Sequence, residues 1–503
     1  MKILKIFLSR IFIFGFLIFI QAVWILLVGA SVIEAYAWLR PFFMVISTLV
    51  VLWLVNKDEN PAYKITWIIL ILVVPVLGGL LYLCVGNKKP SRRIRRTLQP
   101  ILDDMENVML MENEKSHNIQ DGADYGITYL SDLGYGTYQN TETKYYSLSD
   151  YGYGDLLKDI RHAKHYIFME YFIVSEGLMF ETIIKLLKKK VQEGVEVRFI
   201  YDDVGSLTTV PYGFEKQLEA AGIKCVVFNP FIPFLSVAMN HRDHRKICVI
   251  DGYIGYSGGF NLADEYINAK MRFGHWKDTG IRLEGDAVWN LTAMFLSIWN
   301  AYRHEDHEYT QYKPHIHNQD TYHEKGYVVA YGDSPLDEER TGEDIYLNLI
   351  QQAKHEVLIM TPYFIIDDTM MKALTMASKK GVQVKIITPG VPDKKNVYKV
   401  TRSYYHSLIQ EGIEFYEYTP GFMHAKVVLC DNKVATVGTI NFDYRSLYLH
   451  FECNVLLYET MTIQDIHKDF METLSLCQKI DQKHSQRFRG LYEAILRLFA
   501  PLM

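Results

Sequence analysis

A histidine and a lysine recur at one spacing in two places along the chain of 503 residues. Both stretches have the form H-x-K-x-x-x-x-D, and both are followed by a turn of small residues and an asparagine. The residues are His244, Lys246, Asp251 and Asn261 in the first copy and His424, Lys426, Asp431 and Asn441 in the second. One such spacing arises readily by chance, but two with matching surroundings do not. We therefore interpret the copies as two halves of one site.

The residue types in each copy predict chemistry on a phosphodiester. Side chains two residues apart on a strand point to the same face, so the histidine and the lysine of each copy lie together. Two lysines suit an anion, because their ammonium groups donate charge-assisted hydrogen bonds to phosphate oxygens. One imidazole can attack phosphorus while the other protonates the leaving alcohol. A protonated lysine is a poor ligand beside a divalent ion, so we expect neither a metal nor another cofactor.

The elements that must position these residues repeat as well. Residues 164–173 have the composition of a strand, residues 180–193 have a helical pattern, and residues 195–201 form the next strand. The same order returns between residues 353 and 387. Strand–helix–strand order indicates an α/β fold with parallel pairing, and its return indicates duplication. We expect two α/β lobes that form a pseudo-dimer, with one motif from each lobe at their interface.

This interpretation divides the chain into five parts. They are a membrane anchor at 1–96, a connector with one helix at 97–125, a first lobe at 126–318, a second lobe at 319–484 and a C-terminal amphipathic helix at 485–503. The last helix either packs on its own domain or lies on the bilayer, because arginines flank its apolar face. The apolar, proline-broken stretch 228–238 is either a lip that dips into the membrane or a buried loop.

The N-terminal part is strongly apolar. Residues 11–33 and 65–86 are each long enough for a helix to cross the roughly 30 Å hydrocarbon core, and residues 41–55 form a weaker third segment. A cleaved signal peptide is disfavoured, because the first apolar run is too long and a second follows it. We predict two or three transmembrane helices; in one alternative the first segment lies in the interface. The basic block at 88–96 favours cytoplasmic catalytic lobes by the positive-inside rule.

The composition of the chain limits the classes of partner that it is expected to bind. The formal net charge is −5, which disfavours nucleic acid as a partner because nucleic-acid-binding domains are usually basic. The six cysteines are scattered and form no C-x-x-C pair, so we expect reduced thiols rather than disulfides or a zinc ribbon. Membrane lipids are the expected partners, and the sequence indicates no obligatory protein partner.

The two motifs resemble those of the phospholipase D superfamily, a specific signal. Within it, the membrane segments and the flanking sequences resemble the family of bacterial cardiolipin synthases, and the resemblance extends from about residue 40 to 480. The flanking sequences are Asn240 to Lys246, Gly258 to Tyr266 and Trp276 to Thr279. The second copy departs mildly, with Gly438 and Thr439 where the first has Gly258 and Gly259.

The resemblance implies a role for each motif residue. His244 and His424 would be the nucleophile and the general acid/base, and His244 is favoured as the nucleophile. The lysines and asparagines would hold the phosphate, and Asp251 and Asp431 would complete the catalytic set by fixing the motif. Candidate orienting groups in the second lobe are Asp443, Arg445, Ser446, Glu452 and Asn454. Glu170 has Thr361 or Pro362 as its counterpart, so any role for Glu170 is confined to one lobe.

The implied reaction joins two phosphatidylglycerol molecules into cardiolipin and glycerol through a phosphatidyl-histidine. The same residues would serve a phospholipase D-type hydrolase or a phosphatidyltransferase that uses another alcohol, and these alternatives stay open. A nucleic-acid phosphodiesterase is disfavoured by the acidic balance and the membrane segments. A scaffold without activity is disfavoured because both half-sites are intact.

Overall fold

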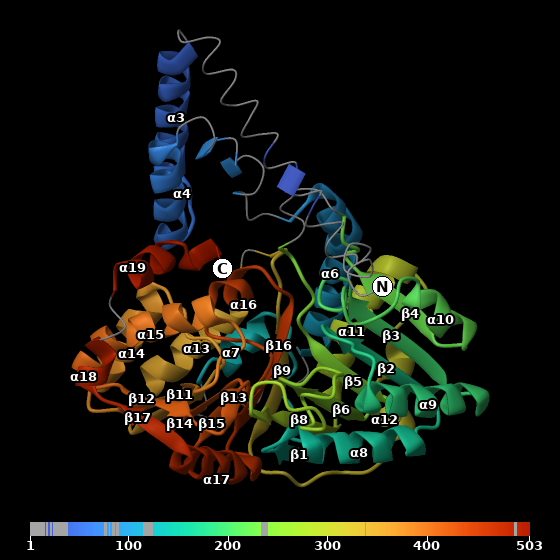
Figure 1. Ribbon diagram of the computed structural model, residues 1–503. Coiled ribbons are helices and arrows are strands. Elements are labelled where there is room, and N and C mark those ends of the chain that lie inside the picture. Colours follow the sequence, from blue (N-terminus) through green and yellow to red (C-terminus); the bar gives the residue numbers. More distant parts are fainter. Residues whose placement is uncertain are drawn as a thin grey trace.

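Two mixed β-sheets, each covered by helices on its outer face, lie side by side in the computed structural model (Figure 1). The model describes residues 39–74, 90–113, 124–232, 240–337, 339–486 and 490–502, together with single positions between residues 16 and 86. The apolar segment 11–33 therefore lies almost entirely outside the described residues, as do parts of 65–86 and most of the stretch 228–238.

The first lobe is built on a seven-stranded sheet. Its strands, in spatial order, are β1 (Thr141–Tyr146), β8 (Gly280–Gly285), β6 (Ile254–Gly258), β5 (Lys246–Ile250), β2 (Tyr166–Tyr171), β3 (Glu196–Asp202) and β4 (Lys224–Phe228). Its outer helices are α8 (Ser149–His162), α9 (Leu178–Gln192) and α10 (Phe214–Ala220). Strands β2, β3 and β4 are parallel, as the strand–helix–strand order predicts, whereas β5 is antiparallel to β2.

The second lobe repeats this order with one added edge strand. Its strands are β17 (Cys477–Ile480), β12 (Glu414–Tyr418), β11 (Gln383–Pro389), β10 (Glu356–Met360), β14 (Val427–Cys430), β15 (Val434–Gly438), β16 (Glu452–Tyr458) and β9 (Tyr327–Asp333). Its helices α13 (Thr341–Gln352), α14 (Asp368–Lys379) and α15 (Lys395–Gln410) cover the outer face. The order β12-β11-β10-β14-β15-β16-β9 matches β4-β3-β2-β5-β6-β8-β1, which confirms the predicted duplication.

A shared core joins the lobes. It contains helices α6 (Arg92–Asn113), α11 (Val288–Arg303) and α17 (Thr462–Ser475), together with the inner faces of both sheets. The segment expected to be a connector thus contributes buried side chains, among them Leu98 and Met105 of α6, which packs on α11. Two short strands, β7 (His275–Lys277) and β13 (Gly421–Met423), pair in parallel across the boundary between the lobes.

The first long helices that the structure describes and the helix near the C-terminus lie together at one end of the molecule (Figure 1). Helices α3 (Leu39–Asn56) and α4 (Pro61–Val73) extend from the body, and α19 (Leu491–Leu498) lies at their base. The hydroxyl of Thr66 in α4 donates to the carbonyl oxygen of Leu498 at 2.6 Å. Within the described part of the chain, no helix combines the length and the apolar character needed to cross a membrane. The remaining helices are α7 (Ile127–Asp132), η3 (Thr310–Tyr312), α12 (Pro314–His317), α16 (Tyr444–Tyr448), α18 (Gln482–Ser485) and η5 (Ala500–Leu502).

The buried face of α19 differs from the one that the sequence pattern predicts. Leu491 and Ile495 lie on the predicted apolar face and are exposed, whereas Leu496 is buried against the second lobe. The five described cysteines (225, 248, 430, 453 and 477) are free thiols, and four of them are buried, as expected.

Candidate active site

The two H-x-K stretches meet at the boundary between the lobes. Each histidine lies two or three positions before a central strand of its sheet, β5 or β14, and each lysine lies at or beside the first residue of that strand. All four side chains are buried, and the exposed fraction is only 8% for His244 and for His424. The charge of Lys246 in the first lobe lowers the pKa of His424 in the second, so the two half-sites are close enough to interact.

Each imidazole is held by a carboxylate of the other lobe. His244 Nδ1 lies 2.8 Å from a carboxylate oxygen of Glu452, and His424 Nδ1 lies 2.6 Å from Oδ2 of Asp278. The backbone N–H groups of the two histidines also donate across the boundary, to the carbonyl oxygens of Phe451 at 2.8 Å and Lys277 at 2.7 Å. Because Nδ1–H donates to the carboxylate, the lone pair of each imidazole is at Nε2.

Both imidazoles are neutral near pH 7. Burial is the main cause that lowers the pKa of His244 to about 3 and that of His424 to about 4. The neighbouring lysine ammonium groups act in the same direction, and the backing carboxylates oppose them. A neutral imidazole with its lone pair at Nε2 can act as a nucleophile or as a general base.

The two lysines titrate unusually close to neutral pH. Burial is the main cause that lowers the pKa of Lys246 to about 8 and that of Lys426 to about 7. Lys246 Nζ donates to the carbonyl oxygen of His244 at 2.6 Å, and Lys426 Nζ donates to that of His424. An anion bound beside these groups favours their charged form, because opposite charges stabilise each other. The pair is therefore suited to a phosphate.

The two asparagines are held in the same way in both lobes. Asn261 Nδ2 donates to the hydroxyl of Tyr266 at 2.7 Å, and Asn441 Nδ2 donates to that of Ser446 at 3.0 Å. Each amide nitrogen carries two hydrogens, so one remains for a phosphate oxygen. Of the suggested orienting groups, Ser446 therefore positions Asn441.

The two motif aspartates lie away from the imidazoles, and grouping them with the catalytic residues needs correction. Asp251 accepts hydrogen bonds from the backbone N–H groups of residues 164–166, and Asp431 accepts from those of residues 354–356, at 2.7 to 3.0 Å. Each aspartate lies five positions after its lysine along an extended strand, which corresponds to about 17 Å. Their carboxylates fix the start of β2 and of β10 and thereby the register of the motif strands.

Glu170 belongs to a buried group of charges behind the first motif. Arg245 Nε lies 2.7 Å from Oε1 of Glu170 and 3.3 Å from Oδ1 of Asp243. Glu170 pairs with Ile247 in the sheet, and the equivalent strand position in the second lobe is Met360, which pairs with Val427. The assignment of Thr361 or Pro362 as its counterpart was therefore wrong by one or two residues. The role of Glu170 is confined to one lobe, as expected.

The sequence patterns assigned no role to Asp278, and they identified Glu452 only as one of several candidate orienting groups in the second lobe. Glu452 begins strand β16, and Asp278 lies just before the equivalent strand β8. An acidic residue at the equivalent position of each repeat was the available signal. The hydroxyl of Thr439, the residue at which the second copy departs from the first, donates to Oε2 of Glu452 at 2.5 Å.

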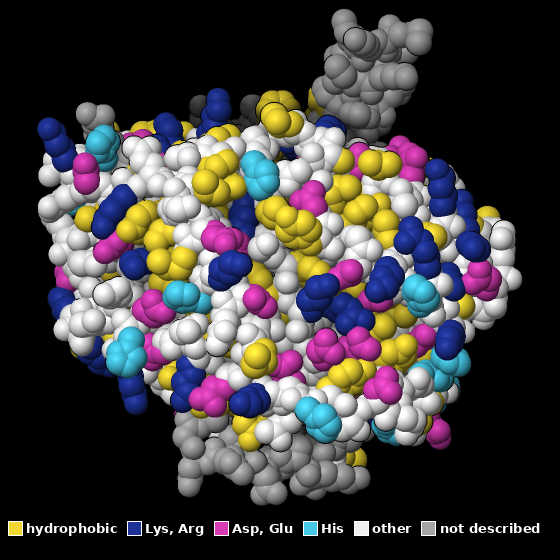
Figure 2. All heavy atoms as spheres, turned by 90° about the horizontal axis from the view of Figure 1, so that it is seen from below, with side chains coloured by type: hydrophobic (Ala, Val, Ile, Leu, Met, Phe, Trp, Pro, Cys, Tyr) yellow, Lys and Arg dark blue, Asp and Glu magenta, His cyan; other side chains and the backbone are white. Residues whose placement is uncertain are grey.

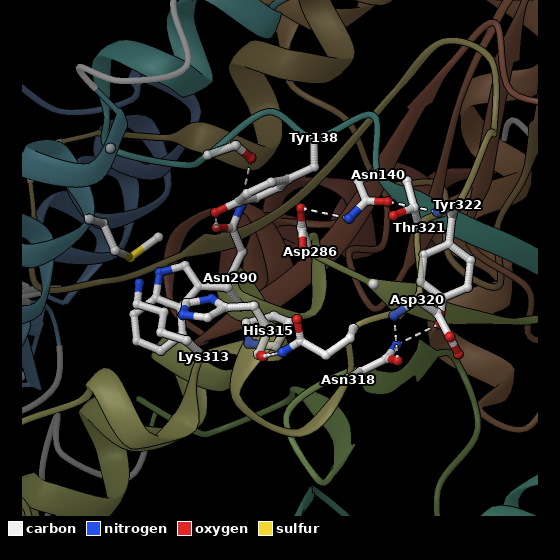
Figure 3. A pocket seen from close by; sticks show the side chains of 17 residues that line it. Tyr138, Asn140, Asp286, Asn290, Lys313, His315, Asn318, Asp320, Thr321 and Tyr322 are labelled. Carbon is white, nitrogen blue, oxygen red and sulfur yellow. Dashed lines mark hydrogen bonds between the residues drawn. The ribbon is translucent and has the colours of Figure 1, made fainter.

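One cavity lies away from the motif residues, and another reaches the surroundings of His244. The first, of about 480 Å³, is bordered by Tyr138, Asp286 and Lys313 and by none of the motif residues (Figure 3). Its polar groups bond to one another, as Asn140 does to Asp286 at 3.0 Å. The second, of about 520 Å³, reaches from the turn between α3 and α4 to His450, whose ring lies 5.6 Å from that of His244.

Comparison with known proteins identifies the family. The family model described as cardiolipin synthase, PLD-like domain, matches residues 156–273 and 346–474, one segment in each lobe. A second model, described as phospholipase D-nuclease N-terminal, matches residues 44–87.

Individual relatives agree with the family models. A cardiolipin synthase of Alkalihalophilus pseudofirmus is 33% identical over 466 residues, which cover 89% of this chain and 90% of that protein. An uncharacterised protein of Streptococcus mutans is 41% identical over 467 residues, which cover 90% of this chain and 99% of that one. The crystal structure of a phosphatidylserine synthase of Haemophilus influenzae has the same fold, with a TM-score of 0.55, 13% identity and coverage of 72% of this chain and 93% of that one. The chain belongs to the cardiolipin synthase family of the phospholipase D superfamily.

Proposed function

We propose that this protein transfers a phosphatidyl group from one phosphatidylglycerol molecule to the terminal hydroxyl of another, giving cardiolipin and glycerol. The observation that carries the proposal is the reciprocal backing of two neutral imidazoles. Each is held at Nδ1 by a carboxylate of the other lobe, and each has a lysine ammonium beside it. Membership in the family supplies the substrate class.

The first half of the reaction forms a covalent intermediate. Nε2 of one imidazole attacks the phosphorus of the first lipid, so that a P–N bond forms and the P–O bond to glycerol breaks. The other imidazole gives its proton to the leaving glycerol oxygen. Because both imidazoles are neutral in the free protein, the negative phosphodiester must favour protonation of the second one on binding. The lysines and asparagines hold the non-bridging oxygens, where charge develops.

The second half reverses these steps with a new alcohol. The second imidazole takes the proton of the incoming lipid hydroxyl, the oxygen attacks phosphorus, and the P–N bond breaks. We assign the nucleophile to His244 and the acid/base to His424. The position of His244 in the first motif supports this assignment, because the resemblance to the family favours that histidine as the nucleophile.

We further propose that residues 1–96 anchor the chain in the membrane through two or three transmembrane helices, with the catalytic lobes on the cytoplasmic face. Exposed apolar side chains at one end support this: Phe42, Val45, Leu49, Leu52 and Trp53 of α3, Leu72 and Val73 of α4, and Leu491 and Ile495 of α19. On the opposite face, positive, negative and apolar side chains are interspersed (Figure 2). The cavity that leads to His450 begins at the turn between α3 and α4, on the membrane side. Protease added to right-side-out vesicles should leave the lobes intact; digestion of the lobes would reverse the orientation.

The activity is tested with purified protein and phosphatidylglycerol alone. We expect cardiolipin and free glycerol in equal amounts. Phosphatidic acid as the main product would replace the proposal by hydrolysis. A product formed only when another alcohol is added would replace it by a different phosphatidyl transfer. Mass spectrometry of acid-sensitive adducts after rapid quenching should find the phosphatidyl group on His244.

A further inference from the structure

A third potential metal ligand lies beside His244 and its backing carboxylate. The ring of His450 is 5.6 Å from the ring of His244, and His450 Nδ1 is 3.7 Å from Oε1 of Glu452. The side chain of His450 is 11% exposed, and neither of its ring nitrogens has a hydrogen-bond partner within the described residues. A largely buried imidazole without hydrogen bonds is costly in free energy. A ligand that binds one of its ring nitrogens would reduce this cost.

We propose that His244, His450 and Glu452 form a site for Zn²⁺ or a similar transition-metal ion, and that an ion bound there inhibits the enzyme. One ligand atom of each residue lies within 4.8 Å of the others. Two imidazole nitrogens and one carboxylate oxygen are a donor set that zinc takes in proteins, with a water molecule in the fourth position. Zinc distances of about 2.0 to 2.2 Å require only that the three groups move slightly toward one centre.

The expected effect on the reaction follows from the imidazole chemistry and rests on the proposed function. An ion on Nδ1 of His244 takes the place of the proton shared with Glu452. The remaining proton is then at Nε2, which leaves no lone pair to attack phosphorus or to accept a proton. An ion on Nε2 blocks that nitrogen directly. The cavity of about 520 Å³ that His450 borders provides the path by which an ion would enter.

The second half-site provides an internal comparison. His424 and Asp278 have the same relation as His244 and Glu452, but the residue at the position of His450 is Trp276. The ring of Trp276 lies 5.4 Å from the ring of His424, and an indole cannot ligate a metal. The half-site of His424 therefore has two of the three ligands, and we expect one ion per chain at the interface.

The binding test does not depend on activity. The full-length protein in detergent is stripped with a chelator and titrated with ZnCl₂ by calorimetry, and with CoCl₂ by visible absorption, which reports four-coordinate geometry. We expect one tight site. His450→Asn should lower the affinity of that site at least about tenfold, because it leaves two protein ligands. His450→Cys should retain tight binding, because a thiolate is a good zinc ligand.

Turnover of phosphatidylglycerol is then measured with and without ZnCl₂. Zinc should inhibit the unaltered protein and the His450→Cys variant and should have little effect on His450→Asn, whose turnover without metal should be retained. Equal zinc affinity of the unaltered protein and His450→Asn, or the absence of a tight site, would overturn the proposal. If zinc binds through His450 but no cardiolipin forms, the proposed function fails and the metal site stands. If zinc inhibits cardiolipin synthesis equally in the unaltered protein and in His450→Asn, the metal site is rejected and the proposed function stands.

Discussion

The two half-sites are alike on the side that faces the substrate and differ behind it. Behind the first motif lies a buried group of charges, and behind the second the same positions are apolar. The equivalent pairs are Glu170 and Met360, Asp243 and Met423, and Arg245 and Ala425. All six side chains are buried. The front faces are alike because each must hold an imidazole, an ammonium group and an amide toward one phosphate, whereas the back faces need only to fill their cores.

The carboxylates that back the imidazoles also differ between the lobes. The backbone N–H of Thr279 donates to the carboxylate of Asp278 at 2.9 Å. A side chain at position 259 would collide with this carboxylate, because a Cβ on Gly259 would lie 2.0 Å from it. Glu452 is one methylene longer and accepts the hydroxyl of Thr439. Gly259 with Asp278, and Thr439 with Glu452, are thus two ways to place a carboxylate against the Nδ1 atom of an imidazole. The departure of Gly438–Thr439 from Gly258–Gly259 follows from the longer acid.

The largest effect should come from removing either imidazole. His244→Ala and His424→Ala should each lower kcat for cardiolipin formation about 10⁴-fold or more, because both act in one site, and the double variant should be little worse than either. Glycerol release from phosphatidylglycerol measures this. The exposed His162, changed to alanine, is the matched control. Near-normal activity in either single variant would mean that the lobes do not share a site.

A smaller loss should follow from neutralising the backing carboxylates. Glu452→Gln and Asp278→Asn keep the size of the side chain but allow the imidazole to adopt the wrong tautomer, which we expect to lower kcat about 10²- to 10⁴-fold. The loss should lie mainly in kcat, since each carboxylate contacts an imidazole at Nδ1. A change in KM alone, with kcat retained, would argue that these acids bind substrate instead.

The buried charges behind the first motif should affect stability. Arg245→Ala leaves Glu170 and Asp243 buried without a countercharge, which should cost about 3 to 5 kcal/mol. The triple variant Glu170→Met, Asp243→Met, Arg245→Ala installs the residues of the second lobe and should recover most of this loss, because apolar groups can replace a buried ionic group. Thermal unfolding in detergent compares the two. A triple variant less stable than Arg245→Ala would show that the charges stabilise the first lobe specifically.

The lysines should make binding sensitive to alkaline pH. The pKa of Lys246 is lowered to about 8 and that of Lys426 to about 7, so each loses its proton as pH rises through these values. We expect kcat/KM, which reports the free enzyme, to fall about tenfold per pH unit above 8 for each titrating lysine. Lys426→Arg should lower the absolute rate but remove one step of this fall, because arginine stays charged. The exposed Lys216, changed to alanine, should leave the profile unaltered.

Much of the architecture was predictable, because duplication leaves a signal that a single copy cannot. The strand–helix–strand order and the paired motifs indicated two lobes with a shared site, and the sheets repeat in the same order. The helix α6 was underestimated, since its Leu98 and Met105 become core residues only when α11 and both sheets are in place. The buried face of α19 was not predicted for a similar reason: its contacts come from the second lobe and not from its own periodicity.

The sequence by itself determined the chemistry of this protein: two histidines, two lysines and two asparagines at matched spacings are residue types suited to a phosphodiester. The tertiary structure alone decided what holds them. The hydrogen bond of His424 joins residues 146 positions apart, and that of His244 joins residues 208 positions apart, each across the lobe boundary. No local pattern encodes such pairs, because they exist only when two sheets pack about a pseudo-twofold axis. The same packing places Asp251 and Asp431 at the far ends of their strands, where they fix the fold rather than contact the phosphate.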